Sequence, residues 1–422
     1  MELVPGAAVI RPQLILAAIG LLAIFGTGQF MKVLSAPIGQ LFAVFTAWFI
    51  ACIPFAAWPG GSFAVFTESW YKAALIYLLT AGLLTTLPQA NRIFHAIAYA
   101  VGLLAVLALL RNNRSGDGRL ILDNTRYANS NDLAWTLLVG LTFIGFLYLR
   151  GKRWQKILAV VMVPPVVLAL SRTGSRSGML GAGVLVIVML VQAKRATRIK
   201  LLVGIPVILM AVVIVMPKDV LLRYTTYFGS YDYYRSFSDP TEHLRAGTIQ
   251  SSEARKQLLI DSLVVTMRHP LLGVGPGNFM VEQDKISQAR GDEKGSWHVT
   301  HNTYTQLSSE MGLPGLIIFI VLLVRVFQVL NAIIRTRNPD EHWQNLKQMA
   351  LALRAAFIVF LPVAFFASLG YNADLPILAG LVTALGFLAQ KQRAIDRTAK
   401  AHTVTAEPLL QPGLEPVPVG QY

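Results

Sequence analysis

The sequence contains little cysteine and little charge. Its 422 residues include one cysteine, Cys52, which has no intrachain partner for a disulfide or a thiolate metal site. Charged residues make up only 14% of the chain, against about 25% in typical soluble domains. The hydrophobic fraction is 54% and the mean hydropathy is +0.54. These values exclude a soluble enzyme, a secreted disulfide-rich module and a disordered chain.

Apolar runs recur along the chain, and each is long enough to cross about 30 Å of hydrocarbon. Backbone groups in lipid must be satisfied within the segment, so the runs are predicted to be helices. We therefore expect an all-α polytopic membrane protein with eleven or twelve transmembrane helices. The first run is followed by no A-x-A cleavage pattern, which favours a retained span over a signal peptide. The runs lie near residues 13–30, 39–57, 71–87, 92–110, 133–149, 155–170, 178–193, 199–216, 313–333, 351–369 and 374–390.

One long polar insertion interrupts this pattern. Within it, the apolar side chains of residues 253–267 cluster at helical spacing. This spacing predicts an amphipathic helix on the bilayer surface, with Arg255 at its polar edge. Four regions follow: an N-terminal transmembrane bundle (1–216), a loop with short amphipathic helices (217–312), C-terminal transmembrane helices (313–390) and a disordered tail (391–422).

The net charge of +15 has a membrane explanation. Lysine and arginine gather in cytoplasmic loops and face anionic membrane lipids, so no nucleic-acid partner is expected. Successive spans place four basic clusters on one face, which is predicted to be cytoplasmic, and the long insertion on the other. With eleven spans the N-terminus lies outside, whereas a hairpin in the first run gives an even count. The clusters lie at 150–156, 194–200, 335–347 and 391–400.

The outer loops nevertheless carry arginine. A fixed cation at a membrane boundary is costly unless an anion meets it, so this set predicts an anion site, with snorkelling side chains as the alternative. Arg176 stands in a small, hydroxyl-rich turn before a helix, a natural place for a phosphate. The outer arginines are Arg111, Arg114, Arg119, Arg126, Arg172 and Arg176.

Two further motifs lie in the insertion. In the segment 268–279, Pro270 is predicted to end the amphipathic helix, and alternate glycines suit a tight corner. No Walker lysine is present, which argues against a nucleotide loop. The second motif contains His298 and His301, without a convincing third metal ligand. His301 is a candidate general base or a structural histidine.

The motif that contains His298 and His301 leads into Glu310 and the segment 312–315, where a glycine–proline pair is predicted to break a short helix just before the ninth span.

These motifs, in this order around one long loop, resemble the O-antigen ligase/O-antigen polymerase family of bacterial envelope proteins. The resemblance covers about residues 110–390, and Ser130 replaces the family's usual proline in one motif. The matching positions are Asn129–Ala134, Ser175-Arg176-Ser177-Gly178, Arg255, His269–Phe279, His301-Asn302, Glu310, Gly312 and Gly315.

The resemblance implies a GT-C-like multi-pass protein of the bacterial inner membrane with a periplasmic active site and no cofactor, nucleotide or required metal. Its donor would be an undecaprenyl-pyrophosphate-linked glycan, and its acceptor lipid A–core or a growing glycan. By resemblance, His301 is the catalytic residue, and Arg176 and Arg255 bind the donor pyrophosphate. The candidate supporting residues are Arg172, Ser175, His298, Asn302 and Glu310.

Three functions remain open at this stage. The leading hypothesis is O-antigen ligation to lipid A–core, and the closest alternative is a polymerase that extends O-antigen or exopolysaccharide repeat units. A small-anion, bicarbonate-type transporter is the alternative of another class. The apolar runs are nearly free of charge, whereas a conduction path places ionisable residues near the middle of the membrane. This argues against the transporter.

Overall fold

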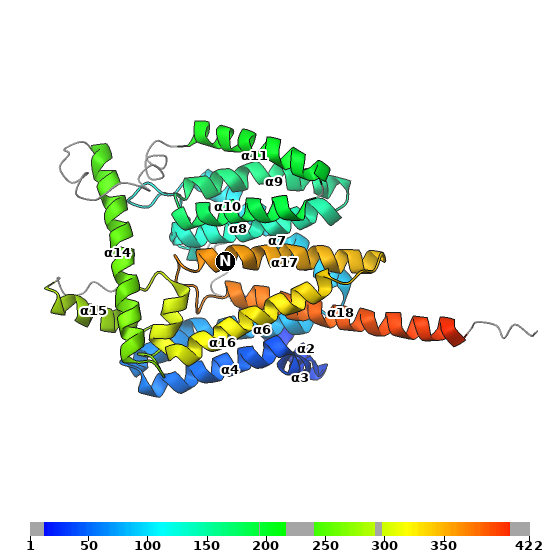
Figure 1. The fold of residues 1–422 in the computed structure, drawn as a ribbon, viewed down its shortest axis with the longest axis horizontal. Coiled ribbons are helices and arrows are strands. Elements are labelled where there is room, and N and C mark those ends of the chain that lie inside the picture. Colours follow the sequence, from blue (N-terminus) through cyan, green and yellow to red (C-terminus); the bar gives the residue numbers. More distant parts are fainter. Residues whose placement is uncertain (1–11, 194, 217–239, 292–297, 406–422) are drawn as a thin grey trace, which may run out of the picture.

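The protein is a bundle of long helices with one helix laid across an end. The computed structural model describes residues 12–193, 195–216, 240–291 and 298–405. Helix α14 (Pro240–Arg268) crosses one end of the bundle, next to the shorter α15 (Phe279–Ala289) (Figure 1). In the described residues the only strand-like pairing is a single bridge between Arg114 and Leu120. The predicted all-α polytopic class is confirmed.

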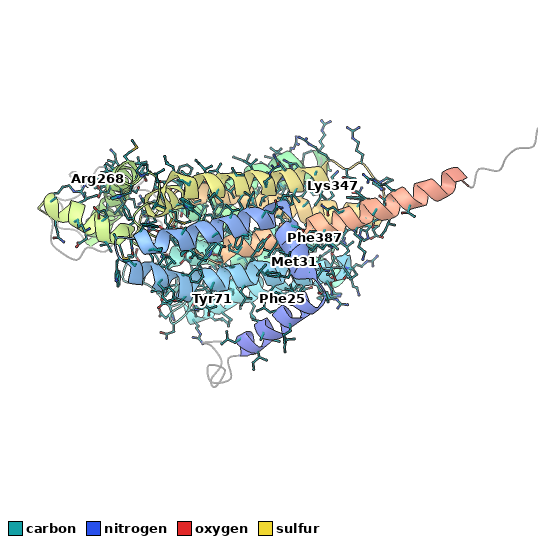
Figure 2. The ribbon with its side chains drawn as sticks, turned by 90° about the horizontal axis from the view of Figure 1, so that it is seen from below. Phe25, Met31, Tyr71, Arg268, Lys347 and Phe387 are labelled. Carbon is teal, nitrogen blue, oxygen red and sulfur yellow. The ribbon has the colours of Figure 1, made fainter. Side chains whose placement is uncertain are left out.

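Each of the predicted apolar runs overlaps a helix of the bundle. Helices that follow one another along the chain mostly run in opposite directions, which brings the four basic clusters to the end away from α14. Figure 2 shows Arg268 of α14 at one end and Lys347 at the other. The helices of the bundle are α2 (Pro12–Gly26), α3 (Gln29–Ser35), α4 (Pro37–Cys52), α5 (Pro59–Val65), α6 (Tyr71–Leu83), α7 (Leu87–Arg111), α8 (Ser130–Arg150), α9 (Arg153–Arg172), α10 (Arg176–Gln192), α11 (Arg195–Val215), α16 (Thr303–Ile334), α17 (Glu341–Val363) and α18 (Asp374–Thr405).

The predicted number of spans is too high for the described residues. Seven helices are long and apolar enough to cross a membrane, or eight if α2 and α3, bent by 83°, form one broken span. Helix α10 has only 17 residues. At 1.5 Å per residue it reaches only about 26 Å. An apolar run therefore did not always mean a full crossing.

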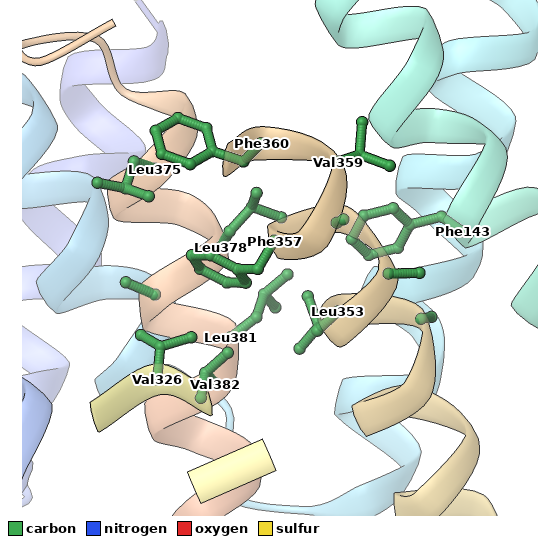
Figure 3. Close-up of a cluster of buried hydrophobic side chains, with 14 of the residues drawn as sticks. Phe143, Val326, Leu353, Phe357, Val359, Phe360, Leu375, Leu378, Leu381 and Val382 are labelled. Atoms are coloured by element: carbon green, nitrogen blue, oxygen red, sulfur yellow. The ribbon is translucent and has the colours of Figure 1, made fainter. Parts of the chain in front are cut away.

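The core lies around α17. About two thirds of the most apolar stretch is buried in α8 (61%), α17 (61%) and α18 (67%), against 33% in α4 and α7. Helices α8, α17 and α18 therefore form the centre of the bundle, whereas α4 and α7 leave one side exposed for contact with lipid. Figure 3 shows Phe357 and Phe360 of α17 between Leu378 of α18 and Phe143 of α8. All four side chains are buried.

Helix α16 is broken at Gly312, as the glycine–proline pair predicted. Gly312 has φ 68° and ψ 179°, a conformation that is essentially restricted to glycine. A break in a buried stretch of helix leaves backbone groups without helical partners, and each unsatisfied buried group costs about 1–3 kcal/mol. These groups therefore need partners from another segment.

The glycine-rich turn after α14 supplies those partners. The backbone of this turn forms hydrogen bonds with the broken segment and ties the turn to α16. The indole of Trp48 on α4 donates to the Met311 carbonyl at 2.8 Å. The backbone bonds are Val274 N–H to Ser309 O (2.9 Å), Gly275 N–H to Glu310 O (2.9 Å) and Leu313 N–H to Pro270 O (2.8 Å).

The glycines of this turn are required by its geometry. Gly273, Gly275 and Gly277 have φ of +65°, +95° and +77°, values that side chains rarely adopt. A Cβ on Gly273 would also collide with the Glu310 backbone. Helix α14 ends at Arg268, just before Pro270. The predicted corner is confirmed.

The structure differs from the predicted division of the chain in two respects. The insertion was expected to hold short helices, but α14 has 29 residues. The tail was expected to begin at residue 391, but α18 continues to Thr405. Residues 391–405 contain neither proline nor glycine, and the tail prolines begin at Pro408. Residues 217–239 of the loop and 406–422 of the tail lie outside the described part.

We expect Gly312→Ala to destabilise the protein strongly. The alanine would hold a conformation that costs about 1–3 kcal/mol, and its Cβ would collide with the Leu271 carbonyl. Gly145→Ala is the matched control, because a Cβ there meets nothing within 4 Å. Thermal unfolding in detergent should show a lower Tm for Gly312→Ala alone. Equal Tm values would contradict the role of the break.

Candidate functional site

A pocket of about 320 Å³ opens at the end of the bundle that α14 crosses. Its walls come from four segments that are far apart in the sequence. Arg176, Arg255 and His301, which were predicted from separate motifs, all line it. The complete lining is Arg176, Ser177, Arg255, Lys256, Leu259, Thr300, His301, Asn302, Phe365 and Phe366.

Arg176 is the first residue of α10. Ser175 caps this helix, its hydroxyl accepting from the Gly178 N–H at 3.1 Å. The N-terminus of a helix carries a partial positive charge and unpaired N–H groups, so Arg176 adds a full charge where an anion is already favoured. Ser175 is buried outside the pocket, and its predicted support of the site consists of this cap.

Arg119 and Asn131 hold that cap in place. Asn131 Oδ1 accepts from Ser175 Oγ at 2.9 Å and from Arg119 Nη2 at 2.8 Å. Arg119 Nε also donates to the Thr173 carbonyl at 2.7 Å, and Arg119 is only 8% exposed. This network braces the turn that leads into Arg176.

The outer arginines therefore do not act as one anion site. Arg119 is a structural brace, and Arg126 pairs with Asp374 at the start of α18, with 2.6 Å between Nη2 and Oδ2. Arg172 ends α9 outside the pocket lining, and its buried Nε has no hydrogen-bond partner among the described residues. Of this predicted set, Arg176 lines the pocket. Sequence position alone did not separate these roles, because the partners are distant in the chain.

Arg255 reaches the pocket from α14, which is firmly attached to its neighbours. Asp261 on α14 is 3% exposed at its side chain and forms a bidentate pair with Arg290, at 2.7 and 2.8 Å. Thr266 lies 2.8 Å from Ser308 of α16 through their hydroxyl oxygens. These contacts fix the rotation of α14 and therefore the direction in which Arg255 points.

The other side of α14 is apolar and exposed. Ile260, Leu263 and Met267 are 45%, 49% and 78% exposed. This is the pattern of a helix that lies along a membrane surface, as residues 253–267 predicted.

His301 stands in a strained turn before α16. Its φ is +50°, which is uncommon for a residue other than glycine and is held only by its surroundings. Asn302 follows as the cap of α16 and accepts from the Tyr304 and Thr305 N–H groups at 2.9 and 3.2 Å. Thr303 N–H donates to the Ala364 carbonyl at 2.7 Å. The hydrogen bonds of the residues that follow His301 thus set the position of its imidazole.

The surroundings of His301 favour its neutral form. Burial, together with the positive charge of Arg255 and the nearby His298, lowers its pKa from 6.5 to about 4. His301 is therefore neutral at physiological pH and has a lone pair available for a proton. His298 itself is exposed and outside the pocket lining.

Glu310 stabilises the glycine-rich turn after α14 and does not line the pocket. Its carboxylate is buried in α16 and accepts from the Gly277 N–H at 2.8 Å. Within the described residues, no cluster of three or more histidine, cysteine, aspartate or glutamate side chains is placed to hold a metal ion. The chemistry of the pocket therefore has to be argued from its cations, His301 and its aromatic side chains.

Sequence reasoning missed several residues of the pocket wall. Leu259 could have been found, because it lies four residues after Arg255 and therefore on the same side of the predicted helix. Lys256 is adjacent to Arg255 in the sequence and also lines the pocket. Phe365 and Phe366 could not, because only the tertiary fold brings the turn after α17 to His301.

The fold and pocket define a polytopic membrane protein with a cationic pocket at one end of its bundle. Residues 166–320 match the profile of the family described as O-antigen ligase. The matched segment covers less than half of the chain and contains Arg176, Arg255 and His301. Members are glycosyltransferase-like enzymes that act on lipid-linked glycans. No curated protein matches the chain.

We expect NMR of ¹³C-labelled histidine to find one residue that titrates near pH 4, because His301 is the buried histidine facing Arg255. Arg255→Gln removes a repulsive charge and should raise this pKa toward 6.5, with a smaller rise in His298→Gln. His301→Gln assigns the signal. A His301 pKa at or above 6.5 in the wild-type protein would contradict the electrostatics of the site.

Proposed function

We propose that this protein transfers a glycan from undecaprenyl pyrophosphate to an acceptor hydroxyl, with O-antigen ligation to lipid A–core as its reaction. The observation that carries this proposal is the convergence of Arg176, Arg255 and His301 on one pocket. Two arginines suit a pyrophosphate, and a neutral histidine suits a hydroxyl group that must lose a proton.

The pocket suits a lipid-linked pyrophosphate by its position as well as its charge. Arg176 approaches from the bundle and Arg255 from α14, so an anion between them meets two planar guanidinium forks. The apolar face of α14 marks the level of the membrane surface. A pyrophosphate at this level leaves its prenyl chain in the bilayer and its glycan outside.

The reaction exchanges one bond for another. The acceptor oxygen attacks the anomeric carbon, the bond from that carbon to the pyrophosphate oxygen breaks, and the leaving group takes the electron pair. The hydroxyl proton passes to His301, which returns it to water or to the pyrophosphate product. Attack from the opposite side inverts the anomeric carbon. Arg176 and Arg255 stabilise the negative charge that grows on the leaving group.

Donor binding strengthens the base in this scheme. In the empty pocket, Arg255 lowers the pKa of His301. A bound pyrophosphate places negative charge beside Arg255 and offsets that repulsion, so the pKa of His301 rises when the donor is present. His301 thus gains basicity only in the complex that needs it.

The pocket is proposed to face the periplasm. The helix ends that carry the four basic clusters lie at the end of the bundle away from α14 (Figure 1), and loops with an excess of lysine and arginine remain in the cytoplasm. The membrane is then the bacterial inner membrane, where a lipid-linked donor is available on the outer leaflet.

Arg176→Lys and Arg255→Lys should each slow transfer about 10- to 100-fold. Each lysine keeps a charge but loses the bidentate fork, and a hydrogen bond to a charged group contributes about 1.5–3 kcal/mol. The rate is measured in proteoliposomes with a lipid-linked glycan donor. Arg268→Lys, at the exposed end of α14, is the control. Wild-type rates in both pocket variants would exclude bidentate pyrophosphate binding.

His301→Ala should abolish transfer while undecaprenyl pyrophosphate still binds. The base acts on the acceptor and does not hold the anion. Binding and transfer are measured on the same preparation. Full transfer by the folded variant would exclude His301 as the base.

The glycan profile of a strain that lacks the gene distinguishes the family's two reactions. Long polymer left on undecaprenyl pyrophosphate, with bare lipid A–core, is expected for a ligase. Single repeat units on the carrier or on the core would instead mean a polymerase. An unchanged profile would contradict both and favour the transporter.

A further inference from the structure

The pocket has an aromatic wall to which neither the proposed pyrophosphate site nor the base assigns a role. Phe365 and Phe366 lie in the turn after α17 and line the same pocket as its cations. We propose that this pair is a stacking platform for the donor sugar attached to the pyrophosphate, which makes it a specificity-determining contact. This inference rests on the proposed function and adds the part of the substrate that the second wall recognises.

The side chains of Phe365 and Phe366 are 55% and 40% exposed, whereas Phe357 and Phe360 on the preceding helix α17 are buried. Large apolar side chains on a cavity wall gain free energy when a ligand covers them. Leu259 on α14, 37% exposed, adds to the same apolar lining.

The turn that carries Phe365 and Phe366 is held rigidly relative to His301. The turn 364–370 is bonded to the turn that carries the base, so the platform and the base form one unit. A ring stacked on this turn is therefore held at a fixed place beside the imidazole. The bonds are Thr300 Oγ1 to Ser368 Oγ (3.1 Å), Thr303 Oγ1 to Ala367 O (2.6 Å), Leu369 N–H to Thr303 Oγ1 (3.0 Å) and Gly370 N–H to Gln306 Oε1 (3.1 Å).

The ring of Phe365 is supported by Tyr304. The rings of Phe365 and Tyr304 have centroids 4.5 Å apart, and the Tyr304 hydroxyl donates to the Leu361 carbonyl at 2.9 Å. Tyr304 therefore braces Phe365 while more than half of Phe365 stays exposed. A braced aromatic ring loses little conformational entropy when a ligand binds to it.

The chemistry favours a sugar over the prenyl chain. The reacting anomeric carbon must lie between the pyrophosphate and His301, so the sugar that carries it has to pass the turn that holds both the base and the platform. A pyranose has a C–H face that packs on the negative face of an aromatic ring, while its hydroxyls point outward. The pocket, at about 320 Å³, is at the small end for ligand sites and suits one sugar better than a long chain.

The test compares two ligands that differ only in the glycan. Binding of undecaprenyl pyrophosphate and of its glycan-bearing form is measured on the full-length protein in nanodiscs. Phe366→Leu should weaken the glycan-bearing ligand about three- to tenfold, on the scale of aromatic contacts, and leave undecaprenyl pyrophosphate unchanged. Phe366→Trp should retain both affinities. Phe365→Leu should act in the same direction as Phe366→Leu.

Phe63→Leu is the matched control, because Phe63 is 58% exposed on α5 and lies outside the pocket lining. It should bind both ligands like the wild type, and equal Tm values exclude misfolding. Equal weakening of both ligands by Phe366→Leu would assign the wall to the prenyl chain and overturn the inference. No effect on either ligand would overturn it as well, leaving the pair as a bilayer anchor.

Failure of the proposed function gives a different result. In that case the wild-type protein binds neither ligand, or Arg176→Lys leaves the binding of undecaprenyl pyrophosphate unchanged. The aromatic inference alone fails when Arg176→Lys weakens both ligands but Phe366→Leu does not discriminate between them.

Discussion

The structure depends on a broken membrane helix whose unpaired backbone groups are satisfied by a loop. Gly312 interrupts α16, and the glycine-rich turn after α14 bonds to the broken segment. A buried break of this kind is tolerated only when other protein groups replace the lost bonds. The break therefore ties the turn after α14 to the helix bundle.

The positions of Arg255 and His301 in the pocket follow from this attachment. The turn lies directly after α14, so fixing it against α16 also fixes the end of the helix that carries Arg255. The short first half of α16 begins at the turn that carries His301. Arg176 comes from α10, whose start is held separately by Arg119 and Asn131. The pocket thus combines one wall from the insertion with another from the bundle.

Electrostatics then distinguishes the residues that converge there. Fixed cations at a membrane boundary favour an anion. Burial and, to a smaller extent, the charge of Arg255 lower the pKa of His301, and the proposed donor offsets only the contribution of Arg255. The site is in this sense complementary to a charged substrate before the substrate arrives.

Much of this arrangement could be predicted from the sequence. Hydropathy located the helices, and the proline and glycine signals located the end of α14 and the break in α16, because these depend on local backbone chemistry. Three motif residues were expected at one site and line one pocket.

Other features depend on tertiary packing and could not be predicted. Apolar runs did not reveal which helices fall short of a full span, since length and bending decide this. The bracing role of Arg119 requires Asn131 and Thr173. Phe365 and Phe366 join the pocket through a turn more than sixty residues after His301. No local pattern in the sequence announces these contacts.

The most direct test of the central claim is an experimental structure of the protein with undecaprenyl pyrophosphate bound. Our account predicts the two phosphates in the pocket, with oxygens about 2.7–2.9 Å from the guanidinium groups of Arg176 and Arg255. The prenyl chain should enter the bilayer, and the terminal phosphate should face His301. Phosphates bound elsewhere, with these arginines turned away from them, would contradict the account.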